Sequence, residues 1–302
     1  MSYSRRQFFV LGSLGLAGIS KFIFPKQGQE IVQATPKNDP PSPIATPEGE
    51  LLLRFVSMAD TGTGAQGQYQ VAQAMSQYYQ KKPFPMVLMA GDNIYNNGEI
   101  SKIQQVFEQP YQPLLEQGVK FHACLGNHDI RSENGDPQVK YSGFNMQGRY
   151  YTFARGGVQF FALDTNNNAN WKDQLTWLES QLSQSNATWK IVFGHHQIYS
   201  SGHYGVNQPF VENLTPLFEK YGVQLYINGH DHHYERTASI NGTTYLICGA
   251  GAGLREVGQS PWTEYSASRL SFAALEVYPQ QIIIQGIATD SSVFDQGLVK
   301  RS

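Results

Sequence analysis

Side chains that can bind metal ions recur in this sequence directly after short apolar runs. Gly91-Asp92-Asn93-Ile94-Tyr95 follows the apolar run 85–90, and Gly126-Asn127-His128-Asp129 follows the run 120–125. Carboxylates, phenolates, amide oxygens and imidazoles are all metal ligands in proteins. A single block of this kind is better explained as a turn, so the prediction depends on how often the pattern recurs.

Five successive predicted strands end in such side chains. In chain order these are Asp60; Asp92 with Tyr95; Asn127 with His128; His195; and His230 with His232. Ligands gather at the carboxyl ends of the strands in open α/β sheets, and chance placement seldom gives such a series. We therefore predict that these strand ends form a metal site. The two histidines of Gly229-His230-Asp231-His232 would project to one side of an extended segment.

The ligand types divide by hardness. Carboxylate and phenolate oxygens suit a hard trivalent ion, whereas imidazoles and an amide oxygen suit a softer divalent one. Tyr95 is informative because a phenol has an ordinary pKa of about 10. It loses its proton on binding a metal only if the metal is a strong Lewis acid such as Fe(III). We predict one metal on Asp60, Tyr95 and a histidine. A second is expected on Asn127 and two histidines, with Asp92 bridging both.

Strands and helices alternate along the part of the chain that positions these residues. Apolar runs predict strands over 51–58, 85–90 and 120–125. Helical spacing of apolar residues predicts a helix over 66–80 and another around 103–115. This β-α-β-α-β order implies a parallel sheet with right-handed crossovers. Under that geometry we expect one edge of the sheet to bring together Asp60, Asp92, Tyr95, Asn127 and His128.

The remainder of the chain is predicted to complete the domain. Segment 131–149 is polar and is expected to be a surface loop. A hairpin is expected from 150–154 and 158–163, with helices around 175–182 and 211–221. The other predicted strands are 189–193, 223–228, 244–248, 272–277 and 281–287. We expect the last three to complete a second sheet, mixed or antiparallel.

Composition limits the classes of function. The chain has 302 residues and a formal net charge of −2, without the basic surplus of a nucleic-acid-binding protein. We expect one catalytic domain over 51–302 and no nucleic-acid partner. Cys124 and Cys248 are too few for a disulfide framework. Two buried thiols are favoured, and a single disulfide stays open.

The N-terminal segment 1–24 matches a twin-arginine export signal. Arg5 and Arg6 precede an apolar run of about a dozen residues, fewer than the roughly 20 that a membrane span needs. We therefore expect no stable membrane span, an interaction with the twin-arginine export machinery, and a periplasmic or extracellular location. Retention as an uncleaved anchor stays open. Segment 25–50 is rich in Pro, Gln and Thr and is expected to be a linker.

The blocks resemble those of the purple acid phosphatases among the calcineurin-like metallophosphoesterases, particularly the small, single-domain, tartrate-resistant type. Tyr95 is diagnostic, because other metallophosphoesterases usually carry Asp-x-His in the first block, whereas here Gly62 stands two residues after Asp60. The resemblance covers about 53–288. The matching blocks are Asp60, Gly91–Tyr95, Gly126–Asp129, Val192–His195 and Gly229–His232.

This resemblance implies a four-layer αββα sandwich with two mixed β-sheets. It also implies a centre of Fe(III) and a divalent metal, which would be Fe, Zn or Mn. The implied roles are Fe(III) binding by Asp60, Tyr95 and His232, divalent-metal binding by Asn127, His195 and His230, bridging by Asp92, and substrate contact by His128 and His203. The role of His196 stays open.

The function implied is hydrolysis of small phosphate monoesters at acidic pH, which is acid phosphatase activity. Two cations would clamp the phosphate, a metal-bound hydroxide would attack phosphorus, and His128 would donate a proton to the leaving oxygen. Two alternatives stay open. One is a phosphodiesterase or nucleotidase acting through the same centre, and the other is a non-catalytic envelope protein that binds iron or phosphate.

Overall fold

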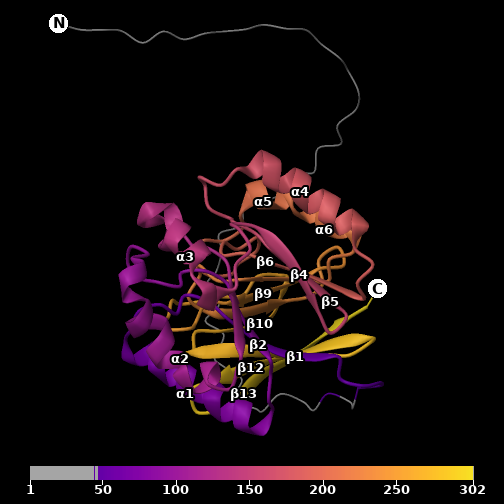
Figure 1. Cartoon of the computed structure of the whole chain (residues 1–302). Helices are drawn as coiled ribbons and strands as arrows, with labels where there is room; N and C mark the ends of the chain where they lie inside the picture. Colours follow the sequence, from indigo (N-terminus) through magenta and orange to yellow (C-terminus); the bar gives the residue numbers. More distant parts are fainter. Residues whose placement is uncertain (1–43, 45–46, 302) are drawn as a thin grey trace, which may run out of the picture. The chain divides into compact units, whose positions relative to one another are not determined.

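Two β-sheets pack face to face in the computed structural model, which describes Ile44 and residues 47–301 (Figure 1). The predicted signal 1–24 and all but five residues of the predicted linker 25–50 lie outside the described residues. In the part that is described, no helix is both long and apolar enough to cross a bilayer.

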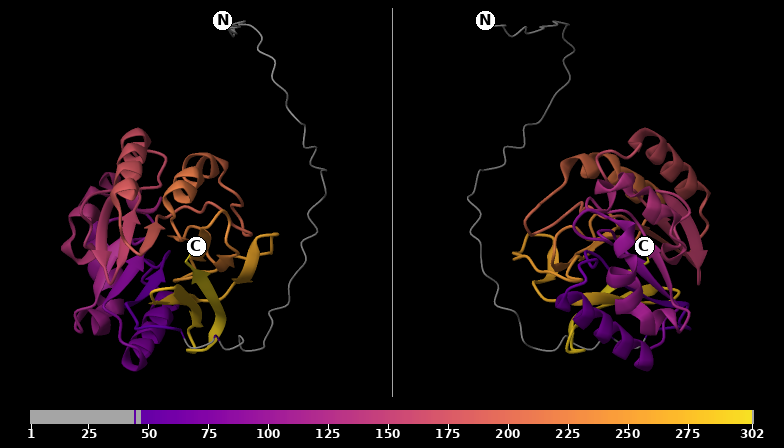
Figure 2. Two further views of the ribbon diagram at one scale, coloured as in Figure 1. Left: turned by 90° about the vertical axis from the view of Figure 1, so that its right-hand side faces the viewer. Right: turned by 60° about the vertical axis from the view of Figure 1, so that its left-hand side comes forward.

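The first sheet is mixed. In its described part the strand order is β13-β12-β11-β1-β2-β3. Neighbouring strands from β1 to β3 are parallel, and those from β13 to β1 are antiparallel. Strand β1 lies beside β2 on one side and β11 on the other, and Figure 2 shows the yellow C-terminal strands close to the indigo N-terminal part. The strands are β1 (Leu53–Met58), β2 (Met86–Met89), β3 (Lys120–Ala123), β11 (Ser271–Val277), β12 (Gln281–Ala288) and β13 (Val293–Lys300).

The second sheet is also mixed, with the order β10-β8-β9-β7-β6-β5-β4. Strands β5, β6, β7 and β9 are parallel, and β4 and β8 pair antiparallel to their neighbours. The strands are β4 (Tyr151–Arg155), β5 (Val158–Ala162), β6 (Trp189–Phe193), β7 (Leu225–Asn228), β8 (Tyr234–Thr237), β9 (Thr244–Cys248) and β10 (Thr263–Ala267).

Helices cover the outer face of each sheet, as Figure 1 shows for α1 and α2 below and for α4 to α6 above. The α-helices are α1 (Gln66–Lys81), α2 (Gln109–Leu115), α3 (Asp136–Lys140), α4 (Trp171–Gln184), α5 (Gln208–Asn213) and α6 (Thr215–Tyr221). Short 3-10 turns are η1 (Ile100–Lys102), η3 (Asp129–Arg131), η4 (Glu133–Gly135) and η5 (Ser142–Phe144), and η2 (Gln104–Glu108) is a π-helical turn that runs into α2.

Alternating side chains on the strands pack into three apolar cores, one between the sheets and one under the helices on each outer face. On β1, Phe55 points into the core between the sheets, and Val56 points into the core under α1 and α2. On β6, Ile191 packs between the sheets, while Val192 packs under α4 and α6. Period-2 alternation with both faces buried is what a strand between two apolar layers requires. The predicted αββα sandwich with two mixed sheets is therefore confirmed.

Three predictions about elements need correction. The tail strands do not form one sheet, because β9 joins the second sheet beside β7 while β11 and β12 join the first. The helix expected around 211–221 is broken into α5 and α6, since Pro216 lacks the N–H that would continue the helix. Segment 131–149 is not simply a surface loop, because Gln138 and Phe144 are buried in it.

Candidate metal centre

The predicted ligands lie in loops that follow strands of both sheets. Asp60, Asp92 and Asn127 come after β1, β2 and β3, whereas His195 and His230 come after β6 and β7. Asp60, Asp92 and Asn127 thus lie at one edge of the first sheet, as the sequence predicted. The structure brings this edge together with the carboxyl ends of parallel strands β6 and β7 of the facing sheet.

Asp60, Tyr95 and His232 form one group of contacts. The Tyr95 hydroxyl donates to Asp60 Oδ1 at 3.0 Å and lies 3.2 Å from His232 Nε2. His232 Nε2 is 3.3 Å from the same Asp60 oxygen. Three potential ligand atoms from three separate loops thus face one another.

Asn127, His195 and His230 form the other group. His195 Nε2 lies 3.1 Å from Asn127 Oδ1 and 3.1 Å from His230 Nδ1. His195 Nδ1 donates to the Ala90 carbonyl at 3.0 Å, which leaves the Nε2 lone pair directed at the other two atoms. Histidine ligands of metals are typically fixed in this way. This donor set therefore fits a divalent cation.

Asp92 lies between the two groups. Its Oδ1 is 3.5 Å from His195 Nε2, and Asp60, Asp92 and His195 each offer a ligand atom within 4.8 Å of the others. Its Oδ1 also accepts a hydrogen bond from the His128 backbone N–H at 2.9 Å. A carboxylate that lies close to ligands of both groups is the type of side chain that can bridge two cations.

The backbone adopts rare conformations at three of these residues. Asp60, Asp92 and His230 have φ angles of 57°, 53° and 69°. Such left-handed residues cost free energy and gather at functional sites. At His230 this conformation excludes the extended segment predicted for 229–232. The two histidines accordingly reach different groups of contacts.

Glycines allow the loops to approach closely. A Cβ on Gly229 would clash with the Asp60 carboxylate, and one on Gly126 would clash with Asp92. The glycines of the Gly-His and Gly-Asn pairs are therefore required by the contacts between the loops.

The charges of the site favour cation binding. Burial and the nearby carboxylates of Asp60 and Asp92 raise the pKa of Tyr95 strongly, so a phenolate at this position needs a strongly charged counter-ion. Burial and the charge of His195 lower the pKa of His230, which favours the neutral imidazole that binds metals. Burial opposes charging of His195, but Asp92 and Asp60 outweigh it and raise its pKa.

His128 lies at the rim of the site with a fixed ring. Its Nδ1 is 2.7 Å from the Asn96 carbonyl, to which it donates, so Nε2 is the nitrogen that faces the site. Asp92 Oδ2 is 3.9 Å from this Nε2, and Arg131 Nη2 is 3.3 Å from it. The Tyr95 ring lies 4.5 Å from the His128 ring. Arg131 was not predicted, and no motif in the sequence marks it.

His203 is not brought into contact with the other predicted residues. It is exposed, and its ring packs edge-on against Tyr204 at 4.8 Å. Tyr204 is the residue that reaches the site, since its ring stacks on His230 at 4.0 Å. His196, whose role the sequence left open, lies 4.4 Å from the His230 ring and could join His195 and His230 around one ion.

Asp129 is a buried carboxylate that the sequence analysis did not single out. It accepts hydrogen bonds from the backbone N–H groups of Asn93, Ile94 and Gly126 at 2.8–3.1 Å. Gln138 Nε2 donates to it as well, at 3.1 Å. It therefore ties the loop of Asp92 and Tyr95 to the loop of Asn127 and thereby positions ligands on both. Burial, followed by the charge of Asp92, raises the pKa of Asp129 to about 7.

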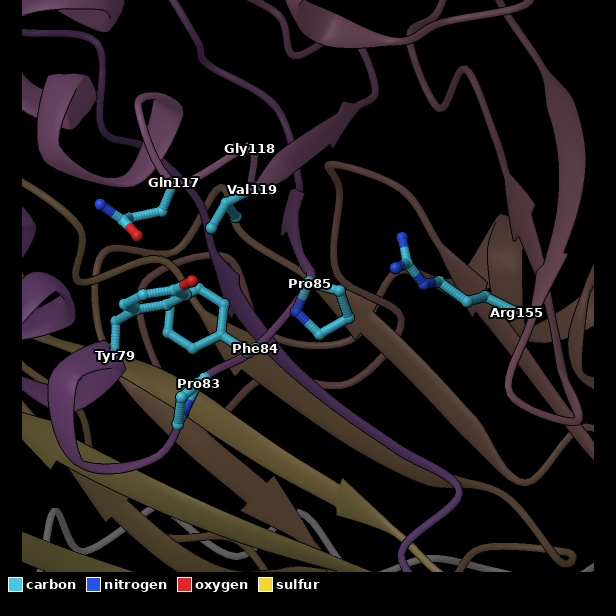
Figure 3. A pocket seen from close by; sticks show the side chains of 8 residues that line it. All are labelled: Tyr79, Pro83, Phe84, Pro85, Gln117, Gly118, Val119 and Arg155. Carbon is cyan, nitrogen blue, oxygen red and sulfur yellow. The ribbon is translucent and has the colours of Figure 1, made fainter.

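A pocket of about 330 Å³ lies at the opposite ends of the strands (Figure 3). Its residues precede β2 and β3 or end β4, whereas the predicted ligands follow β2 and β3. It is lined by Tyr79, Pro83, Phe84, Pro85, Gln117, Gly118, Val119 and Arg155. This pocket is therefore separate from the candidate metal centre.

Sequence comparison places the chain in a family. The family described as Calcineurin-like phosphoesterase matches residues 53–234. Purple acid phosphatase 7 of Arabidopsis thaliana is 31% identical over 245 residues, which cover 70% of this chain and 73% of the relative. Tartrate-resistant acid phosphatase type 5 of Oryctolagus cuniculus is 26% identical over 299 residues, covering 83% and 92%. The chain belongs to the calcineurin-like phosphoesterases and, among them, to the purple acid phosphatases.

Solved structures share the fold. A purple acid phosphatase from seeds of yellow lupin (Lupinus luteus) superposes with a TM-score of 0.71 at 21% identity, covering 83% of this chain and 54% of that one. GAP50, the anchor in the inner membrane complex of Plasmodium, gives 0.73 at 22% identity, covering 83% and 89%. These structures support the fold, whereas the family match and the sequence relatives confirm the predicted family and the assignment as a phosphatase.

Proposed function

We propose that the chain hydrolyses small phosphate monoesters at acidic pH through a centre of Fe(III) and a divalent ion, which is Fe, Zn or Mn. The observation that carries this proposal is the pair of contact groups, Asp60–Tyr95–His232 and Asn127–His195–His230, with Asp92 between them. The first group offers hard oxygen ligands and the second offers mostly nitrogen. The ligand set of the purple acid phosphatase family therefore agrees with contacts made in this chain.

When bound, the two cations supply Lewis acidity, which acidifies water even at low pH and neutralises phosphate charge. The side chains of the protein perform the other tasks. Asp92 lies between the two groups and would bridge the ions, and Asp129 fixes the loops that carry Asp92 and Asn127. His128, held through Nδ1, presents Nε2 to the substrate and donates a proton to the leaving oxygen. Arg131 lies beside it and adds positive charge for the phosphate.

The fold by itself does not decide between catalysis and binding, since the Plasmodium anchor shares it. Support for catalysis comes from the donor set and from His128. A protein that only binds iron or phosphate has no need of a proton donor fixed beside the metal ligands. Hydrolysis is therefore favoured over the non-catalytic alternative.

Metal analysis, visible spectra and turnover of p-nitrophenyl phosphate together test the proposal. We expect two metal ions per chain, at least one of them iron, a phenolate-to-iron charge-transfer band and highest turnover below neutral pH. Tyr95→Phe should lose the band, whereas Tyr69→Phe, which alters an exposed tyrosine, should keep it. Oxidised, metal-loaded wild-type protein without the band would contradict the Fe(III) assignment.

The phosphodiesterase alternative has its own test. Metal-loaded protein is given bis-p-nitrophenyl phosphate and p-nitrophenyl phosphate in parallel. The proposal expects a higher kcat/KM for the monoester. A higher value for the diester would replace the monoesterase proposal with a phosphodiesterase acting through the same centre.

A further inference from the structure

An exposed tyrosine forms part of the wall of the candidate metal centre. The Tyr204 ring stacks on the His230 ring with centroids 4.0 Å apart and planes inclined by 19°. Tyr204 retains 39% of its surface in contact with solvent. Its hydroxyl makes no hydrogen bond within residues 47–301. Tyr204 therefore offers a hydroxyl without an internal partner, on a ring that stacks against a proposed ligand of the divalent ion.

A buried charged network fixes the loop that carries Tyr204. Asp231 Oδ2 accepts from the Ser200 hydroxyl at 2.7 Å and from the Tyr204 backbone N–H at 3.1 Å. Glu235 accepts from the Ser201 N–H at 2.7 Å. His233 lies between the two carboxylates, 3.7 Å from Asp231 and 3.2 Å from Glu235. Asp231 Oδ1 and His233 Nδ1 have no hydrogen-bond partner among the described residues, but the buried Asp231 Oδ2 binds both Ser200 and the Tyr204 backbone. Tyr204 is therefore anchored through its N–H and is not a loose surface residue.

Arg255 lies beside Tyr204 with part of its guanidinium available. Its Cζ is 5.0 Å from the Tyr204 ring centroid, and its Nη1 donates to the His230 carbonyl at 2.9 Å. Its backbone N–H donates to the His232 carbonyl at 2.8 Å. In the described part of the chain, Nε and Nη2 donate no hydrogen bond, and the ion pair with Asp231 is long at 4.0 Å. The side chain is 34% exposed, so water or a ligand can reach these N–H groups.

The guanidinium is close enough to act on a substrate bound at the metals. Because the separations of 5.0 and 4.0 Å can at most add, Cζ lies within about 9 Å of the His230 ring centroid. The scissile phosphate would be held by the metals and would not need Arg255. A phosphate group elsewhere in the same substrate could reach Arg255 and the Tyr204 hydroxyl. Guanidinium pairs with phosphate through two parallel N–H···O bonds.

We propose that Arg255 and Tyr204 form a subsite that selects substrates with a second phosphate group close to the scissile one. The subsite rests on the proposed function, because it assumes that the scissile phosphate binds at the metals. Inorganic pyrophosphate is the smallest such substrate. Its hydrolysis adds the oxygen of one water to the attacked phosphorus, breaks the bridging P–O bond and releases two phosphates.

Substrate selectivity is the first test. The kcat/KM of metal-loaded full chain is measured for pyrophosphate and for p-nitrophenyl phosphate. A hydrogen-bonded charge pair predicts that Arg255→Gln lowers the pyrophosphate-to-monoester ratio about ten- to hundredfold. Arg255→Lys should recover part of this ratio, and Tyr204→Phe should lower it less. The control Arg269→Gln, which alters an exposed arginine paired with Asp290, should leave the ratio unchanged.

Equal loss of activity toward both substrates in Arg255→Gln would overturn the subsite, because Arg255 would then only support the backbone at His230 and His232. Ligand binding gives a readout independent of turnover. Calorimetry on metal-loaded protein should show that Arg255→Gln weakens methylenediphosphonate but not methylphosphonate. Equal weakening of both would overturn the subsite. If wild type hydrolyses neither substrate, the proposed function fails, and the binding comparison still decides the subsite.

Discussion

The chain carries a histidine whose environment should make the protein less stable in acid. His122 on β3 is half-buried, and its ring stacks on Phe153 with centroids 4.0 Å apart. Its Nδ1 is buried and has no hydrogen-bond partner among the described residues. Burial, together with the positive charge of Arg155, lowers the pKa of His122 from 6.5 to about 4. Because the unfolded chain has the higher pKa, it takes up the proton first as the pH falls, and stability is lost between about 6.5 and 4.

Replacing His122 with phenylalanine tests this reasoning. The two pKa values imply that His122 lowers the free energy of unfolding by at most about 2 kcal/mol at pH 5 and by almost nothing at pH 8. The value at pH 5 is an upper bound because the ring keeps some contact with water. His122→Phe keeps the stack on Phe153 and removes the titrating group. We therefore expect its effect on the free energy of unfolding to be up to about 2 kcal/mol more stabilising at pH 5 than at pH 8. This difference corresponds to about 4–8 °C in Tm.

Urea unfolding of wild type and variant, followed by tryptophan fluorescence at equal metal content, measures the difference at both pH values. The comparison cancels all other groups that titrate in common. An effect of His122→Phe that is the same at pH 5 and pH 8 would show that His122 does not carry the acid sensitivity. A larger stabilisation at pH 8 than at pH 5 would reverse the sign and refute the burial argument.

Two further predictions concern the proton donor and the N-terminus. His128→Ala should lower kcat for p-nitrophenyl phosphate about hundredfold or more, while elemental analysis finds the metal content of wild type; unchanged kcat would exclude His128 from the mechanism. Replacing Arg5 and Arg6 together by lysine should keep the chain in the cytoplasm, as judged by cell fractionation. Export of this double variant would disprove the twin-arginine signal.

Elements with continuous apolar runs were predicted well from the sequence. Strand β6 and strand β9 have the predicted bounds, and β4 pairs with β5 as the predicted hairpin. Strand β8 was missed because Glu235 and Arg236 interrupt its apolar pattern. Both are nevertheless buried, since Arg236 pairs with Asp295 at 2.8 Å and Glu235 accepts from Ser201. Partners so distant in the chain cannot be inferred from the local pattern.

The seven predicted ligands could be selected from the sequence because each follows a strand, and four of the five strand ends are visible as apolar runs that stop at glycine. Residues that act through distant contacts left no such mark. Arg255 meets Tyr204 across some fifty residues of chain, and Asp129 meets Asn93 across 36. The same limit applies to His203, for which the family resemblance implied substrate contact. In that loop the residue in contact with His230 is Tyr204.

Both proposed ions draw their ligands from the two facing sheets. Asp60 and Tyr95 come from loops of the first sheet, and His232, which completes their group, comes from a loop of the second. Under the proposed assignment, the ligand set of each ion is complete only when both sheets are in place, so full metal uptake would wait until the two halves have joined. If the chain is exported already folded, the ions it carries are those of the compartment where it was made, and not those of the place where it works.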